Sequence, residues 1–214
     1  MTPELFLPLA EKTGLIIPIG NWVINEACRQ LREWHLQGHR NWSMAVNLST
    51  LQFEQPSLVK TVLDCLTRHD VPPEMLILEV TETTAMSNPD ESVRVLTELT
   101  NAGVKASIDD FGTGYSSLLY LKRLPASELK IDRAFVQELS GESEDATIVS
   151  AIVALAKTLN LKVVAEGVET EAQQTFLTEL GCHTLQGYLL GKPVSAQTIE
   201  ALCEHGEMLP GAEV

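Results

Sequence analysis

The sequence predicts a parallel α/β fold of the (β/α)8 TIM-like barrel type. Strand and helix patterns alternate along the chain, each expected strand is an apolar run, and each of these runs ends in a polar side chain. Six strand–helix units are visible, whereas a complete barrel has about eight. We therefore expect a barrel-type sheet that is short of strands.

The chain opens with two helical patterns. Thr2 and Pro3 are typical of an N-cap followed by a first helical residue, and Gly14 is a natural stop. A second helix is expected over 20–37. Its apolar residues recur at helical spacing, which predicts one core-facing side formed by Trp22, Val23, Ala27, Leu31 and Trp34.

Strands and helices then alternate to the end of the chain. Strands are expected at 43–49, 75–80, 104–109, 128–132, 161–166 and 183–188. Helices are expected at 57–69, 89–103, 117–124, 151–159 and 170–180, and from about Ser195. No linker or change in composition interrupts this order, so we expect residues 1–214 to form a single domain.

An open, doubly wound sheet would also alternate in this way. The dinucleotide-binding form of that fold carries GxGxxG after a strand, and no such motif occurs here. The barrel is favoured by the polar residues at the strand ends, because barrel enzymes keep their active sites there.

Composition narrows the classes of function. The net charge of −14 and the pI of about 4.7 argue against a protein that clamps polyanions non-specifically. The four cysteines are far apart and form no CxxC pair, which is typical of a reduced, cytoplasmic protein. No stretch approaches the roughly 18 apolar residues of a membrane span.

Every expected strand ends in or near a residue that can bind a metal ion or move a proton. These residues are Asn47, Glu79, Asp109, Asp110, Lys130, Asp132, Glu166 and Gln186. A single polar strand end is readily explained by solvation, but the same pattern at all six indicates a functional site.

Carboxylates with an amide oxygen, and without Cys or His, are suited to Mg²⁺ or Mn²⁺. Crowded carboxylates repel one another, so two divalent ions would offset the repulsion. Such a pair of ions can clamp the attacking and leaving oxygens in phosphodiester hydrolysis, and Lys130 could orient the attacking water or hold a phosphate oxygen.

Six stretches carry a resemblance to a known family: VNLS (46–49), LEVTET (78–83), DDFGTGYSSL (109–118), ELKIDRAFV (128–136), VVAEGVET (163–170) and QGYLLGKP (186–193). In this order the chain resembles the EAL-domain family. The resemblance implies a barrel that hydrolyses cyclic di-GMP to linear pGpG with Mg²⁺ or Mn²⁺.

The resemblance also implies a role for each matching residue. It gives metal ligation to Asn47, Glu79 and Asp109, and to Asp110 for a second ion. Lys130 matches a lysine beside the attacking water, Glu166 a carboxylate near it, and Gln186 a supporting glutamine. The resemblance also assigns a role in substrate binding or in holding the active-site loop to Glu82, Glu169 and Asp132. The similarity of the loop after Asp110 implies a homodimer.

One departure concerns the Glu-Ala-Leu motif of the family, which is absent from this chain. The resemblance implies that the absent stretch held the first two strands of the (β/α)8 barrel. We expect either a fragment or a natural truncation, with weak or no turnover by the chain alone. The parent protein could carry sensory or diguanylate-cyclase-like domains and a membrane anchor. Two other functions stay open, a non-catalytic sensor that binds cyclic di-GMP and a dimerisation module.

Overall fold

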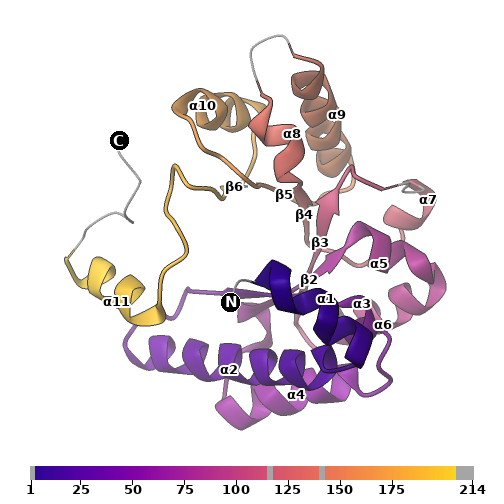
Figure 1. The fold of residues 1–214 in the computed structure, drawn as a ribbon, viewed down its shortest axis with the longest axis vertical. Helices are drawn as coiled ribbons and strands as arrows, with labels where there is room; N and C mark the ends of the chain where they lie inside the picture. The colour runs from indigo at the N-terminus through magenta and orange to yellow at the C-terminus, as the bar shows by residue number, and fades with distance from the viewer. Residues whose placement is uncertain (1–2, 115–117, 140–142, 206–214) are drawn as a thin grey trace. The chain divides into compact units, whose positions relative to one another are not determined.

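The computed structural model of the protein describes residues 3–114, 118–139 and 143–205 (Figure 1). Contacts divide the chain into two compact units. Unit 1 comprises Met1–Ile108 and Ser116–Ala126, and unit 2 comprises Asp109–Tyr115 and Ser127–Val214. The expectation of a single domain over residues 1–214 stays a prediction.

Unit 1 contains the helices that precede the third strand. Its elements are α1 (Pro3–Thr13), α2 (Ile16–Leu36), β1 (Met44–Leu48), α3 (Thr50–Phe53), α4 (Leu58–His69), the 3₁₀ turn η1 (Pro73–Met75), β2 (Leu76–Thr81), α5 (Glu82–Ser87), α6 (Pro89–Asn101), the first part of β3 (Lys105–Phe111) and α7 (Leu118–Leu121). Helix α2 packs on α4 and on β1.

Unit 2 begins at the last residues of β3. Its other elements are β4 (Glu128–Ile131), α8 (Arg133–Gln137), α9 (Glu144–Thr158), β5 (Lys162–Ala165), α10 (Glu171–Leu180), β6 (Thr184–Leu185) and α11 (Ala196–His205). Helix α9 packs on β4 and β5, so both strands have apolar cover, and Leu129, Ile131 and Val163 are fully buried.

The six strands follow one another in the sheet in chain order, β1-β2-β3-β4-β5-β6. The pairs β1/β2, β4/β5 and β5/β6 are parallel. An open doubly wound sheet reverses its strand order at a switch point, and this sheet does not. The predicted α/β class with barrel-type winding is therefore confirmed.

All six predicted strands are present, with ends shifted by a few residues. The sequence did not predict α3 and α5, and it predicted only helical material without bounds where α8 lies; these three helices have four to six residues. Each is started by a local cap rather than by apolar periodicity: the side chains of Ser49, Thr81 and Asp132 accept hydrogen bonds from the first-turn backbone. The expected N-cap of α1, Thr2, lies outside the described residues.

The predicted core face of α2 is partly wrong. Trp22 is 64% exposed, whereas Ala27, Leu31 and Trp34 are buried as expected. The buried side of the helix includes Ile16, Gly20 and Ile24, and Trp22 is two residues, or about 200°, around the helix from Gly20. Val23 is also exposed, and with Trp22 it lines an apolar pocket of about 700 Å³ in unit 1.

Gly20 lies inside α2, although the sequence suggested that the helix begins there. A Cβ at this position would lie 1.8 Å from the side-chain nitrogen of the buried Gln52, so the glycine permits close packing of α2 on α3. Within the described ranges, no helix is both long enough and apolar enough to cross a membrane.

Candidate functional site

The predicted site residues of unit 1 lie at the carboxyl ends of β1 and β2. Asn47 is the register partner of Glu79, so the two side chains lie next to each other on one face of the sheet. Glu79 is 8% exposed. Glu82 begins α5 and is buried.

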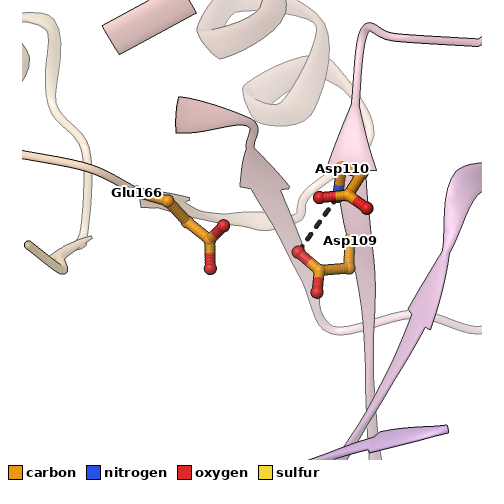
Figure 2. A group of neighbouring side chains, drawn as sticks. All are labelled: Asp109, Asp110 and Glu166. Carbon is orange, nitrogen blue, oxygen red and sulfur yellow. Dashed lines mark hydrogen bonds between the residues drawn. The ribbon is translucent and has the colours of Figure 1, made fainter. Parts of the chain in front are cut away.

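The predicted residues of unit 2 include a compact acidic group. Carboxylate oxygens of Asp109, Asp110 and Glu166 all lie within 4.8 Å of one another, and we call these three residues the acidic triad. Figure 2 shows the two aspartates side by side at the end of β3, with Glu166 facing them from the residue after β5. Residues 57 positions apart in the sequence thus converge, as expected for the carboxyl ends of parallel strands.

The backbone at Asp110 explains how two consecutive aspartates join one site. Successive side chains of a regular strand point to opposite faces. Asp110 instead has a φ of 54°, in the left-handed region that Asp tolerates better than most residues. Its backbone N–H donates to Asp109 Oδ1 at 3.0 Å, the bond drawn in Figure 2. This turn breaks the alternation and keeps both carboxylates together.

Lys130 supplies a positive charge to the acidic triad. Its ammonium group lies 3.2 Å from Asp109 Oδ1 and 2.7 Å from Glu166 Oε1. The side chain of Lys130 is only 5% exposed, so these ion pairs are little screened by water. The sequence predicted that Lys130 lies among the acids, and in unit 2 it does.

The positive charge of Lys130 does not fully offset the repulsion between the carboxylates of the acidic triad. The pKa of Asp110 is raised from 3.8 to about 6, first by burial and then by the charge of Asp109, with further contributions from Asp132 and Glu166. At neutral pH the ionised carboxyl of Asp110 therefore remains in an unfavourable, negative environment. A bound cation would remove that cost, and hard oxygen ligands of this kind fit Mg²⁺ or Mn²⁺.

A pocket of about 550 Å³ lies beside the triad, and we call it the unit 2 pocket. The triad members Asp110 and Glu166 belong to its lining, as do the predicted residues Asp132, Glu169 and Gln186. Arg133, Gln137 and Tyr188 also line it, and the sequence analysis did not include them. The pocket is far larger than one ion requires and has the size of a small-ligand site.

Close backbone contacts fix the segment after β6 against the segment after β5 in the lining of the unit 2 pocket. A Cβ at Gly187 would lie 2.1 Å from the Val168 carbonyl oxygen, so only glycine lets these segments approach. The N–H of Val168 donates to the carbonyl of Gln186 at 3.0 Å, and the N–H of Leu189 donates to the carbonyl of Val168 at 3.0 Å. The segment that carries Gln186 and Tyr188 is thereby attached to the residues after β5.

Gln173 links the segment after β5 to helix α8, and the sequence analysis did not include it. Its side chain is buried, accepts from the N–H of Glu169 at 2.8 Å and donates to the carbonyl of Val136 at 3.0 Å. Thr170 and Gln173 form a capping box at the start of α10. The T-x-x-Q spacing at a predicted helix start could have revealed this contact.

Comparison with known proteins places the chain in a family. The family model described as "EAL domain" matches residues 1–193. The chain belongs to the EAL domain family. The strand order described above is thus that of an EAL domain, as the resemblance implied.

Similar proteins include two from Pseudomonas aeruginosa. "Bifunctional diguanylate cyclase/cyclic di-GMP phosphodiesterase MucR" is 65% identical over 94% of this chain, and "Cyclic di-GMP phosphodiesterase NbdA" is 45% identical over 92%. The chain spans 29% and 25% of these two relatives, less than a third of their length.

Solved structures agree with the fold. The structure "PaMucR Phosphodiesterase, c-di-GMP complex" has a TM-score of 0.91 and 65% identity, and the match covers 93% of this chain and 81% of that one. "Crystal structure of FimX EAL domain from Pseudomonas aeruginosa bound to c-di-GMP" has a TM-score of 0.83 at 27% identity, with 90% and 77% covered. The functional roles predicted for individual residues stay predictions, as does the placement of Asn47 and Glu79 beside the acidic triad.

We predict that Asp109→Asn weakens Mn²⁺ binding at least about 10-fold, because it removes one charge from the triad while keeping its shape. Isothermal titration calorimetry of the whole chain measures the dissociation constant. Asp64→Asn is the matched control, since Asp64 lies on α4, is 52% exposed and pairs only at the surface with Lys60. Equal affinity in the Asp109 variant and the wild type would contradict a metal role for the triad.

We predict that Lys130→Met destabilises the metal-free protein by about 3–5 kcal/mol, because it leaves the buried carboxylate of Asp109 and the partly buried one of Glu166 without their cation. Urea unfolding with EDTA measures this loss. Saturating Mn²⁺ should recover part of it, since a divalent ion would restore positive charge. Lys162→Met, at an exposed position of β5, should cost less than about 0.5 kcal/mol. Similar losses in both variants would refute the explanation.

Proposed function

We propose that this chain hydrolyses cyclic di-GMP to linear pGpG as a metal-dependent phosphodiesterase. The proposal rests on the acidic triad around the buried Lys130, which lies beside a pocket of about 550 Å³. The names of MucR and NbdA, and the c-di-GMP complex of the MucR phosphodiesterase, support this substrate.

Two divalent ions, Mg²⁺ or Mn²⁺, are part of this proposal. In unit 2 the acidic triad would hold the ions. Asn47 and Glu79 are proposed as further ligands because the chain belongs to the EAL domain family. Bound ions of this kind supply an activated water and neutralise charge on the phosphate. The raised pKa of Asp110 and the all-oxygen donor set support a cation at this place.

The chain's own groups have defined tasks in the proposed reaction. Lys130 donates hydrogen bonds, so it would hold the attacking water or a phosphate oxygen in line with the P–O bond that breaks. Glu166 is 18% exposed, pairs with Lys130 and lines the unit 2 pocket, which suits a carboxylate that accepts a proton from that water. Gln186 lines the pocket and would orient the substrate.

The expected product is one pGpG per cyclic di-GMP. Incubation of the whole chain with cyclic di-GMP and Mn²⁺, followed by ion-exchange chromatography, should show pGpG, and EDTA should abolish it. Asp110→Asn should lower kcat about 100-fold or more, whereas Asp64→Asn should not change it. Binding of cyclic di-GMP without any pGpG would instead support the non-catalytic sensor.

The proposal also covers the oligomeric state, the cellular location and the attached domains. Leu118 and Leu119 of α7 are 59% and 69% exposed, which supports a homodimer through this helix. The four free cysteines support a cytoplasmic location, and the multidomain name of MucR supports attached domains in the parent protein.

We predict that Leu119→Asp weakens the dimer, because it places a charge in the apolar contact. Size-exclusion chromatography with light scattering gives the mass of each variant. Leu36→Asp, on the exposed end of α2, is the control and should leave the mass unchanged. A monomeric wild type at micromolar concentration would remove the homodimer from the proposal.

A further inference from the structure

A buried amide in the first turn of α10 uses all of its hydrogen-bonding groups. Gln173 is 6% exposed. Its Oε1 accepts from the N–H of Glu169 at 2.8 Å and from that of Thr170 at 2.9 Å. Its Nε2 donates to the carbonyls of Val136 at 3.0 Å and Gln137 at 3.4 Å. A glutamine side chain has two acceptor positions and two N–H donors, so all four are engaged with backbone.

The four backbone partners of Gln173 belong to two helix ends of opposite polarity. Thr170 is the N-cap of α10, and N–H groups at such an end lack partners within the helix. Val136 and Gln137 are the last residues of α8, where carbonyls lack partners for the same reason. A neutral amide carries both a donor and an acceptor, so it can cap both ends at once. A carboxylate or an apolar side chain cannot.

These helix ends carry two neighbouring residues of the pocket lining. Glu169 and Gln137 both line the unit 2 pocket, and the Gln137 side chain donates to Glu169 Oε1 at 3.5 Å. Gln173 is bonded to the backbone of each. The other end of α8 is fixed separately, because a Cβ at Gly167 would lie 2.6 Å from the Cβ of Arg133. Gln173 therefore ties the end of α8 to the segment after β5, as Gly167 does at the start of α8.

We propose that Gln173 is a positioning residue for substrate binding. By capping α8 and α10 together, it holds Glu169 and Gln137 in the relative placement in which they contact the substrate. This rests on the proposed function. Gln173 is a positioning residue rather than a catalytic one, because its amide is fully used by backbone groups.

Other contacts hold the acidic triad. Glu166 Oε1 pairs with Lys130 at 2.7 Å, and the N–H of Glu166 donates to the carbonyl of Ile131 at 3.2 Å. These contacts do not pass through Gln173. Loss of its amide should therefore weaken substrate binding and leave ion binding and the chemical step almost unchanged.

Two variants of the whole chain test this role. Gln173→Met removes all four hydrogen bonds, whereas Gln173→Glu keeps the acceptor for the start of α10 and loses only the donor to α8. Both should raise KM for cyclic di-GMP about 10-fold, with kcat and the dissociation constant of Mn²⁺ within about 3-fold of the wild type. Steady-state kinetics at saturating Mn²⁺ and calorimetry with Mn²⁺ measure these values.

The next residue of α10 provides matched controls. Gln174 makes no side-chain hydrogen bond in the described part of the chain. Gln174→Met and Gln174→Glu carry the same chemical changes on the same helix, so they should leave KM within about 2-fold of the wild type. An equal rise in KM in the Gln174 variants would overturn the proposal.

A double-mutant cycle tests whether Gln173 acts through the two lining residues. In a Gln137→Ala/Glu169→Ala background, Gln173→Met should change KM by less than about 2-fold, because the side chains that it positions are gone. A full 10-fold effect in that background would overturn the proposal.

Urea unfolding of the same variants separates positioning from a merely structural role. A lower free energy of unfolding with KM unchanged would assign Gln173 to the fold alone and overturn the proposal. Should Gln173→Met fail to fold, Gln173→Glu carries the test, since it retains the cap of α10. Failure of both variants to fold would also overturn it.

Failure of this inference differs from failure of the proposed function. If the wild type yields pGpG and KM is unchanged in the Gln173 variants, only the positioning role is wrong. If the wild type binds cyclic di-GMP without hydrolysis, the proposed function is wrong, and the dissociation constants for cyclic di-GMP take the place of KM in deciding on Gln173. A wild type that neither binds nor hydrolyses cyclic di-GMP overturns both.

Discussion

The repulsion between carboxylates that the fold brings together is the constraint on which the site depends. Asp109, Asp110 and Glu166 present oxygens within 4.8 Å of one another, largely shielded from solvent. Such a group is tolerated only with positive charge close by. Lys130 provides one charge, yet the pKa of Asp110 remains raised to about 6. The site is thus only partly neutralised by the chain itself, which leaves a place for divalent cations.

Local backbone features help to bring the carboxylates and the surrounding segments close together. The left-handed conformation of Asp110 brings two consecutive carboxylates to one place, at a cost of about 1 kcal/mol for a residue with a Cβ. Gly167 and Gly187 then allow the segments after β5 and β6 to approach neighbouring backbone more closely than any side chain would permit. The stability that these positions give up is compensated by the apolar strands behind them, where Leu129, Ile131 and Val163 are fully buried.

The strand ends could be predicted because their signal is local: an apolar run that stops at a carboxylate, an amide or a lysine. Contacts between helices and strands leave weaker signals in the sequence. Trp22 fits an apolar pattern yet is exposed, because the pattern does not fix which side of α2 meets the core. The ion pairs of Lys130 required the strand register. Arg133 and Tyr188 follow strand-end residues by one or two positions and resemble ordinary surface side chains until the pocket they share is seen.

The order of residues along the chain explains why the acidic triad and the unit 2 pocket lie side by side. After β4, Asp132 is followed at once by Arg133; after β5, Glu166 is followed by Gly167; after β6, Gln186 is followed by Gly187 and Tyr188. Each strand end thus contributes a polar group and, one or two residues on, a residue that shapes the pocket. Because both come from the same short segment, a shift of one strand would disturb the acidic triad and the pocket together. A substitution at the second position, in contrast, can alter the pocket and leave the acids in place.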